Sequence, residues 1–296
     1  MRFGLVILPQ YDWPEAARRW RQAEQLGFDH AWTYDHLSWR GLAGERWHAT
    51  VPTLTAAAMV TERIRLGTFV ASPNYRHPVP FAKDVATLDQ VSGGRLILGL
   101  GSGGTGFDAY VLGQSELSAR ERYERFREFT EALDVLLRFE RGSGEGISYS
   151  GDRFSAVSAR MVGEPAQEPR MPFLMAANGP RAMRLAARYG SGWVTTGGGD
   201  LATDAAWWAH LADLVARLDD ALAAEERAPD EFDRVLSLDG DTRYSMASVA
   251  AFEDAVGRAR DLGFTDVVAH RPREHGLYAG SEAVLEEIGA RLPALR

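Results

Sequence analysis

The chain has 296 residues, a formal net charge of −8, 45% hydrophobic residues and no cysteine. Such a composition is typical of a globular enzyme with a large apolar core, in one or two domains. The acidic balance argues against a nucleic acid as partner, because neutralising phosphates requires clustered basic residues. The lack of cysteine excludes disulfides, thiolate nucleophiles and iron–sulfur clusters held by thiolates.

The apolar N-terminal segment RFGLVILP is too short for the hydrophobic region of a signal peptide and runs directly into Pro9, Tyr11 and Pro14. We therefore expect it to form a strand. No stretch approaches the ~18 apolar residues of a membrane-spanning helix. These features predict a cytoplasmic protein without a membrane partner.

Short apolar runs alternate with helical patterns along the whole chain. The predicted strands are residues 3–8, 30–34, 65–71, 96–101, 173–177, 192–196, 235–239 and 266–270. The predicted helices lie near residues 14–26, 50–61, 79–91, 118–138, 180–189, 202–227, 248–261 and 281–292. Strict alternation of eight strands and eight helices predicts a single α/β domain over residues 1–296, a (β/α)8 TIM barrel.

Two long connections interrupt this alternation. Residues 102–117 form a glycine-rich loop after the fourth strand. Residues 139–172 form an insertion before the fifth strand, and within it residues 146–157 predict a hairpin that turns at Gly151-Asp152. Long loops in a compact barrel are commonly functional, so we expect both to contribute to a ligand site.

The segment Gly99–Gly104, with sequence GLGSGG, fits the G-x-G-x-x-G pattern of dinucleotide-binding folds. In those folds the motif ends the first strand and a helix begins at once, whereas here it follows the fourth strand and the next helix begins near Ser118. The match therefore does not predict a nicotinamide dinucleotide site. Exposed backbone N–H groups at Gly101, Ser102 and Gly103 would suit an anionic or planar ligand. A tight turn without any ligand explains these glycines equally well.

The active site of a (β/α)8 barrel lies at the carboxyl ends of its strands. Asn178-Gly179 and Thr196-Gly197-Gly198 are small-residue loops at such ends and next to helix starts, so they could share one phosphate. Asn178 is alternatively an ordinary helix N-cap. The residues that follow the predicted strands are Pro9, Gln10, Tyr11, Asp35, His36, Trp39, 68–72, 101–104, 177–180, 195–199, His270 and Arg271.

His36 lies where a catalytic group is expected, and an imidazole can give or take a proton near neutral pH. Asp35 could fix its tautomer, although a buried structural histidine is the alternative. Residues 39–48, WRGLAGERWH, predict an aromatic wall or a mobile lid, whereas Trp207 and Trp208 are expected to pack within a helix. The histidines lack the spacing of a metal site, so we expect no metal.

Four segments resemble the bacterial luciferase-like family of flavin and deazaflavin oxidoreductases. They are YDHLSW (34–39), IRLGTFVASPNYRHPVPFAKDVATLDQVSGGRLILGLGSGG (64–104), AANGPRAMRLAARYGSGW (176–193) and LGFTDVVAH (262–270). The family fold is a (β/α)8 barrel with an insertion after strand 4 or 5, in agreement with the alternation of elements. The resemblance implies a flavin across the strand ends, its ring resting on a bulge in the third strand.

By position, the resemblance implies a bulge at Thr68-Phe69-Val70, with a cis peptide bond between Phe69 and Val70. It also implies that His36 approaches the reactive edge of the ring, and it makes His36 and Trp39 the candidate catalytic residues. The implied cofactor contacts, including those of the ribityl phosphate, are His36, Thr68, Phe69, Val70, Gly101, Ser102, Gly103, Ala177, Asn178, Gly179, Thr196 and Gly197.

Members of this family use either FMN, often with oxygen, or the deazaflavin coenzyme F420, which transfers a hydride. An Asp-His pair followed closely by a tryptophan is more similar to the deazaflavin branch, so coenzyme F420 is the favoured cofactor and FMN the alternative. Gly104 and Gln10 stand where the deazaflavin-dependent sugar-phosphate dehydrogenases have acids. That departure argues against sugar-phosphate oxidation.

The resemblance thus predicts hydride transfer between coenzyme F420 and a small organic substrate. The alternatives are an FMN-dependent monooxygenase using O2, a non-catalytic flavin-binding barrel, and a barrel enzyme whose glycine loops hold a phosphorylated metabolite. The family often dimerises through helices near strands 2 and 3, which makes the apolar residues 53–59 and 85–88 candidates for a homodimer interface. A separate flavin or F420 reductase is a further expected partner.

Overall fold

The computed structural model describes residues 1–103, 107–139, 145–198, 201–240 and 243–296. Eight parallel strands form a closed barrel in the order β1-β10-β9-β8-β7-β4-β3-β2, so the predicted (β/α)8 barrel is confirmed. Each predicted strand is present, shifted at its ends by a few residues at most. Their bounds are β1 (Arg2–Val6), β2 (His30–Thr33), β3 (Arg65–Thr68), β4 (Leu96–Leu100), β7 (Phe173–Ala176), β8 (Gly192–Thr195), β9 (Asp233–Ser237) and β10 (Asp266–His270).

All eight predicted helices are present as well. They are α1 (Trp13–Gln25), α2 (Thr50–Ala58), α3 (Pro78–Ser92), α5 (Ala119–Leu137), α6 (Pro180–Tyr189), α7 (Asp204–Ala224), α8 (Val249–Asp261) and α9 (Glu282–Leu295). The prediction that the next helix after β4 begins near Ser118 was wrong, because the glycine-rich loop over residues 102–117 contains the short helix α4 (Phe107–Val111). Five residues are too few to show a helical period in sequence.

Contacts between Cα atoms group the chain into two compact units. The first, here called the terminal unit, comprises Met1–Leu8, Arg18–Trp32 and Leu174–Arg296. The second, the central unit, comprises Pro9–Ala17 and Thr33–Phe173. The expectation of one domain over the whole chain stays a prediction.

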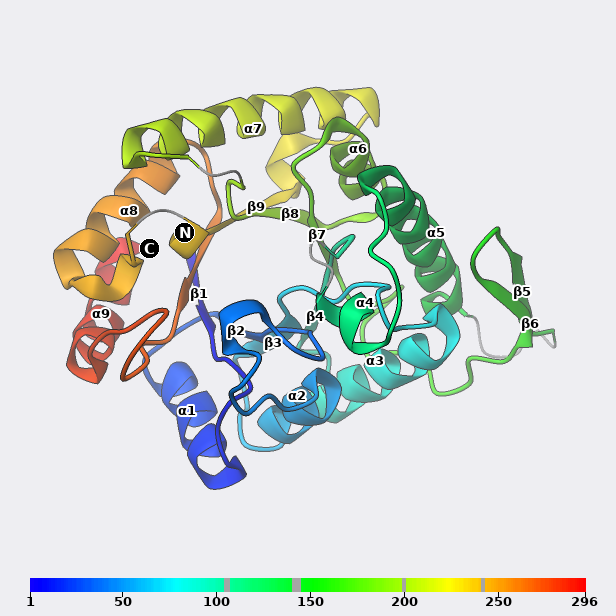
Figure 1. Ribbon diagram of the computed structural model, residues 1–296, viewed down its shortest axis with the longest axis horizontal. Helices are drawn as coiled ribbons and strands as arrows, with labels where there is room; N and C mark the ends of the chain where they lie inside the picture. Colours follow the sequence, from blue (N-terminus) through cyan, green and yellow to red (C-terminus); the bar gives the residue numbers. More distant parts are fainter. Residues whose placement is uncertain (104–106, 140–144, 199–200, 241–242) are drawn as a thin grey trace. The chain divides into compact units, whose positions relative to one another are not determined.

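The predicted hairpin of the insertion belongs to the central unit. Strands β5 (Ile147–Ser150) and β6 (Ser155–Ala159) pair antiparallel, and Figure 1 shows them beside α5. The turn closes where it was expected, with Gly151 N–H donating to the carbonyl of Phe154 at 2.9 Å. Glu128 of α5 is buried, and its Oε1 accepts the backbone N–H of Phe154 at 2.6 Å. The insertion is therefore held to α5 by a carboxylate.

Helix α3 of the central unit contacts both α2 and α5. Val85 and Leu88 are consequently buried inside the unit, so the prediction that residues 85–88 belong to a homodimer interface was wrong. Met59, just after α2, is exposed. Only the first of the two candidate segments therefore retains a large apolar side chain at the surface.

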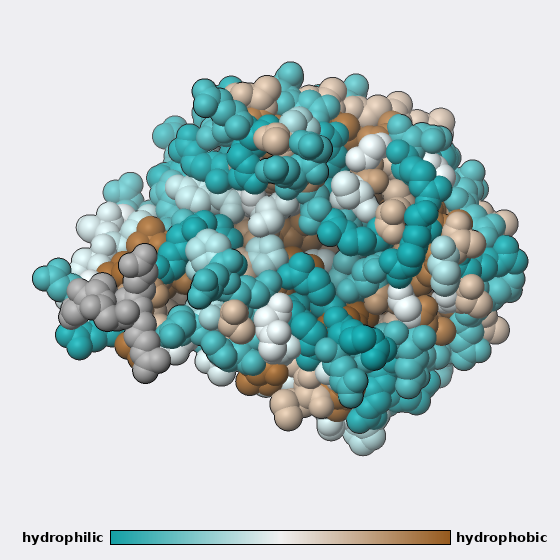
Figure 2. Space-filling model, turned by 180° about the vertical axis from the view of Figure 1, so that it is seen from behind, coloured by the Kyte–Doolittle hydropathy of each residue, from teal (hydrophilic) through white to brown (hydrophobic). Residues whose placement is uncertain are grey.

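The surface is largely polar, as Figure 2 shows for one face of the molecule, where hydrophilic residues predominate and hydrophobic ones form small separate groups. None of the described helices is long and apolar enough to cross a membrane. Within the described ranges, no three His, Asp or Glu side chains are grouped in a way that would hold a metal ion.

Candidate active site

His36 follows the carboxyl end of β2 and is held by a carboxylate from a distant part of the central unit. Its Nδ1 lies 3.0 Å from Oδ2 of Asp108 on α4. The other oxygen, Oδ1, accepts the backbone N–H of Leu37 at 2.8 Å. The Asp108 side chain is fully buried, whereas the His36 side chain is 19% exposed. The histidine ring is thus fixed on one edge and reaches solvent on another.

The charge state of Asp108 determines which tautomer His36 adopts. Burial alone would raise the pKa of Asp108, but the hydrogen bond and charge of His36, with the Leu37 N–H and the Asn74 amide, lower it below its ordinary value. Asp108 is therefore ionised at neutral pH and can only accept hydrogen bonds. His36 must then carry its proton on Nδ1, which leaves the lone pair of the neutral ring on Nε2. Nε2 is the atom that can take a proton from a substrate.

Asp35 does not have the role that was expected of it. Its two oxygens accept hydrogen bonds from Nε and Nη2 of Arg76, at 3.0 and 2.5 Å, in a bidentate ion pair. Burial and the charge of Asp35 raise the pKa of the neighbouring Tyr75, which stays neutral. Asp35 and His36 thus have separate partners, and the carboxylate that fixes His36 is Asp108.

The loop after β3 contacts both carboxylates. Arg76 pairs with Asp35, and Asn74 donates Nδ2 to Asp108 Oδ2 at 3.3 Å. Asn74 in turn accepts a hydrogen bond at Oδ1 from Arg125 of α5, at 2.5 Å. No motif in the sequence connects His36 with these residues, so none of Asp108, Asn74, Arg76 and Arg125 was predicted.

Three aromatic side chains form a wall next to His36. The rings of Tyr34 and Trp39 meet edge to face at 5.1 Å, and those of Trp39 and Trp47 stack at 6.3 Å with an angle of 16° between their planes. Trp47 Nε1 donates to the backbone carbonyl of His36 at 2.9 Å. Trp39 is buried, so of the two expected forms, wall or lid, the structure has the packed wall. A catalytic role for Trp39 stays a prediction.

The third strand carries the expected irregularity. The peptide bond between Phe69 and Val70 is cis, as the resemblance implied. Regular pairing of β3 ends at Thr68, whose Oγ1 donates to the carbonyl of Gly99 at 2.7 Å. A Cβ at Gly99 would lie 1.9 Å from the Thr68 carbonyl oxygen. The first glycine of the G-x-G-x-x-G match is therefore required by the close approach of β3, and Val70 is left half-buried at the strand end.

The glycine loop after β4 differs in detail from the expectation. The Gly101 N–H donates to the carbonyl of Ala71 at 2.8 Å and so is not available to a ligand, because β3 and β4 resume pairing beyond the bulge. Gly103 has φ +71°, and a Cβ there would lie 2.4 Å from the Asn74 amide. Ser102 and Gly103 are half-buried. Gly104 lies outside the described residues.

In the terminal unit, the loops after β7 and β8 lie together as predicted. Thr195 Oγ1 donates to Asn178 Oδ1 at 2.7 Å and accepts the Gly197 N–H at 2.9 Å. This bond occupies the Gly197 N–H, which was expected to bind phosphate. The N-cap of α6 is Gly179, not Asn178. Exposed residues at this edge include Asn178, Gly179 and Thr196, whereas Ala177 is buried. Gly199 lies outside the described residues.

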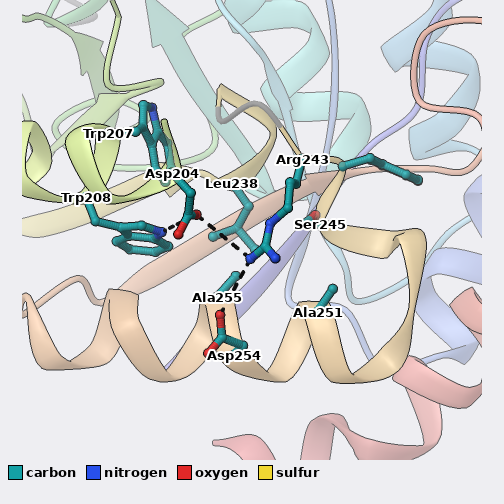
Figure 3. A pocket seen from close by; sticks show the side chains of 10 residues that line it. Asp204, Trp207, Trp208, Leu238, Arg243, Ser245, Ala251, Asp254 and Ala255 are labelled. Carbon is teal, nitrogen blue, oxygen red and sulfur yellow. Dashed lines mark hydrogen bonds and ion pairs between the residues drawn. The ribbon is translucent and has the colours of Figure 1, made fainter. Parts of the chain in front are cut away.

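Trp207 and Trp208 are buried in α7, so their predicted packing role is confirmed. Trp207 Nε1 also donates to the Thr196 carbonyl at 3.1 Å. Figure 3 shows the pocket that both tryptophans line with Arg243, which lies 3.8 Å from Asp204. Its volume of about 20 Å³ admits roughly one water molecule. This pocket is too small for a flavin.

A family model described as luciferase-like monooxygenase matches residues 1–257. The chain belongs to this family. It is 40% identical over 178 residues to an F420-dependent glucose-6-phosphate dehydrogenase of Beutenbergia cavernae, covering 60% of the chain and 50% of that protein. It is 33% identical over 291 residues to a protein of the same name from Nakamurella multipartita, covering 97% and 77%. The chain spans 50% to 62% of the length of the Beutenbergia protein and of three other dehydrogenases with the same name.

Solved structures share the fold. An F420-dependent secondary alcohol dehydrogenase, in complex with an F420-acetone adduct, superposes with a TM-score of 0.81 at 17% identity, over 100% of this chain and 99% of the other. The coenzyme F420-dependent tetrahydromethanopterin reductase of Methanopyrus kandleri gives 0.76 at 20% identity, over 100% and 99%. At these identities the likeness is one of fold alone.

Proposed function

We propose that this protein is an F420-dependent oxidoreductase that transfers a hydride between the coenzyme and a small organic substrate. The observation that carries the proposal is the pairing of His36 Nδ1 with the buried, ionised Asp108 at the end of β2. It provides a proton acceptor at Nε2, which a dehydrogenase of alcohols requires. The relatives from Beutenbergia and Nakamurella, both named F420-dependent dehydrogenases, support the choice of coenzyme.

The residues of the central unit fit a planar deazaflavin ring. Val70 offers a half-buried apolar surface at the bulge after Thr68, and glycine at position 99 lets β3 and β4 approach there. We propose that Thr68, Phe69 and Val70 support the ring and that the backbone of Ser102 and Gly103 lies along its side chain. The contacts expected from Ala177, Asn178, Gly179, Thr196 and Gly197 of the terminal unit stay predictions.

Bound coenzyme F420 would accept or supply the hydride. In the direction of alcohol oxidation, His36 Nε2 takes the hydroxyl proton while the hydride leaves the carbon that bears the oxygen, so a carbonyl forms. Asp108 stabilises the positive charge that His36 then carries. In the reverse direction His36 returns this proton to the carbonyl oxygen. The wall of Tyr34, Trp39 and Trp47 limits the access of water to this proton transfer.

The proposal is tested by binding and by tracing hydrogen. Purified protein is titrated separately with coenzyme F420 and with FMN, and the complex with F420 is incubated with secondary alcohols deuterated at the carbinol carbon. We expect F420 to bind more tightly than FMN and deuterium to appear in the reduced coenzyme. Tight binding of FMN, together with transfer of an oxygen atom from O2 to a substrate once the bound FMN has been chemically reduced, would establish the monooxygenase alternative. Binding without turnover would establish the non-catalytic one. The homodimer, the separate reductase and the cytoplasmic location stay predictions.

A further inference from the structure

Three arginines gather at one edge of the central unit. Arg122 and Arg125 lie three residues apart on α5 and so share a face of that helix. Arg153 lies in the turn of the β5–β6 hairpin, and its backbone N–H donates to Oε1 of Glu128 on the same helix at 2.9 Å. Figure 1 shows this hairpin beside α5. Burial, and then the positive charges of Arg153 and Arg122, lower the pKa of Arg125. Arg122 and Arg153 therefore both repel Arg125.

Little in the described part of the chain compensates these charges. Arg125 makes its hydrogen bond to the neutral amide of Asn74, and its Nε is buried without a hydrogen-bond partner. The Arg153 guanidinium forms no ion pair with a described residue, although its charge acts on the exposed Glu121. Arg122 donates Nη1 to the Leu117 carbonyl at 2.6 Å and has the exposed Glu116 at 3.6 Å. Arg127, on the same helix, contacts both oxygens of Glu131 at 3.0 and 2.8 Å. In a chain with a net charge of −8, acidic side chains are abundant, yet no acidic residue among the described ones is paired with Arg125.

This cluster adjoins the candidate active site through Asn74. The Asn74 side chain binds Arg125 through Oδ1 and Asp108 through Nδ2. Gly103, with positive φ, lies against the same amide, where a Cβ would come within 2.4 Å. An anion on the Arg125 guanidinium would thus lie near the glycine loop after β4 and be separated by one side chain from the carboxylate that holds His36.

We propose that Arg125, assisted by Arg122 and Arg153, binds an anionic group of a ligand, either a phosphate or a carboxylate. A guanidinium forms strong charge-assisted hydrogen bonds with both groups, and a bound anion would relieve the repulsion that Arg122 and Arg153 exert on Arg125. The anion belongs either to the side chain of coenzyme F420 or to the substrate. Only this assignment of its source rests on the proposed function.

The anion site is tested first with inorganic phosphate, without any coenzyme. The melting temperature is followed as phosphate is added, with chloride at equal ionic strength as reference, for the wild type, Arg125→Gln and the control Arg127→Gln. A ligand that binds the folded state alone raises the melting temperature. We expect phosphate to stabilise the wild type and Arg127→Gln but not Arg125→Gln, with Arg125→Lys intermediate. Equal shifts in all variants, or none in the wild type, would overturn the proposal.

The source of the anion is then found with two ligands, coenzyme F420 and its chromophore lacking the phosphate-bearing side chain. If the anion is that of the coenzyme, Arg125→Gln weakens F420 binding by about 10- to 100-fold, the worth of a charge-assisted hydrogen bond, and leaves chromophore binding unchanged. If it is that of the substrate, both affinities persist and KM rises instead. If Arg125→Gln weakens the binding of both ligands equally, Arg125 only positions Asn74, which contradicts the proposal. If no form of F420 binds, the proposed function fails, while the phosphate titration still decides the anion site.

Discussion

Two histidine–aspartate pairs near the two ends of β2 have the same chemistry and different surroundings. His30 begins the strand and lies 3.0 Å from Asp266, and His36 follows the strand and lies 3.0 Å from Asp108. In both pairs burial opposes ionisation of the carboxylate, and the hydrogen bond and charge of the histidine lower its pKa nonetheless. The two pairs have the same separation, although Asp266 is also paired with Arg2 at 2.7 Å.

They differ in what the second ring nitrogen does. His30 uses both nitrogens, because Nδ1 accepts Trp32 Nε1 at 2.6 Å while Nε2 faces Asp266, and its side chain is only 4% exposed. His36 is 19% exposed and is held through Nδ1. A histidine bonded on both sides stabilises the fold, whereas one held on a single side can exchange protons with a ligand.

A third pair shows that a position at the carboxyl end of a strand is not sufficient. His270 ends β10 and lies 2.8 Å from Asp239, with both side chains buried. The ring of Tyr278 stacks on it at a centroid distance of 3.8 Å. His270 therefore lies at a strand end, as His36 does, but is covered by an aromatic ring. Exposure together with a fixed tautomer marks His36 as the candidate base.

The largest expected effect comes from removing this base. We expect His36→Ala to lower kcat about 10²- to 10⁴-fold, the usual contribution of a general base. Its free energy of unfolding should also fall, by about 1–3 kcal/mol, because the buried Asp108 carboxylate loses its imidazole partner and keeps only the Leu37 N–H and the Asn74 amide. Steady-state kinetics and urea unfolding measure the two quantities, with the exposed His48→Ala as control. Turnover at the wild-type rate would remove His36 from the mechanism.

The converse result is expected for the pair at the start of β2. Asp266→Ala leaves His30 and Arg2 without their shared carboxylate, and breaking a buried pair in this way costs about 3–5 kcal/mol of stability. The folded fraction should retain its kcat, since neither residue approaches a ligand in the proposed mechanism. Urea unfolding combined with an activity assay on the folded protein checks both statements. A loss of activity without a loss of stability would reverse the contrast between the pairs.

An effect no larger than that of His36→Ala is expected from Asp108→Asn. The amide keeps the size of the side chain but carries no charge to stabilise protonated His36 and can hold the ring in the wrong tautomer, so we expect kcat to fall by up to about 10⁴-fold. The affinity for coenzyme F420 should remain, which separates a positioning role from a binding role. An equal loss of coenzyme affinity and turnover would show that Asp108 merely supports the loop.

The sequence predicts the scaffold far better than the partner of His36. Alternating elements are local patterns, and the resemblance located the bulge at Thr68-Phe69-Val70 and its cis bond. Asp108 is 72 residues from His36 and lies on a helix too short to show a period. Asp35, its neighbour in sequence, was the natural candidate, but pairs with Arg76 instead.

The glycine motif was misleading for a related reason. Gly99 is explained by the approach of the Thr68 carbonyl and Gly103 by that of the Asn74 amide, and both contacts are made by residues about 30 positions away. The pairing that occupies the Gly101 N–H is likewise set by the register of β3 and β4 beyond the bulge. A spacing rule applied to GLGSGG alone cannot take these distant contacts into account.

The smallest predicted effect is on the pH dependence of stability. Because folding lowers the pKa of Asp108, its contribution is fully present above the unfolded value of about 3.9 and is lost as the pH falls through the folded pKa. The free energy of unfolding of the wild type should therefore decrease as the pH falls below about 4. Asp108→Asn should show a shallower decrease, since the amide at position 108 binds no proton on unfolding. Urea unfolding at stepped pH measures both slopes. Asp266→Asn removes the other carboxylate whose pKa is lowered by folding, so it should make the decrease shallower as well. Parallel curves for the wild type and Asp108→Asn would mean that His36 does not hold Asp108 ionised, and the difference drawn between the two ends of β2 would then rest on exposure alone.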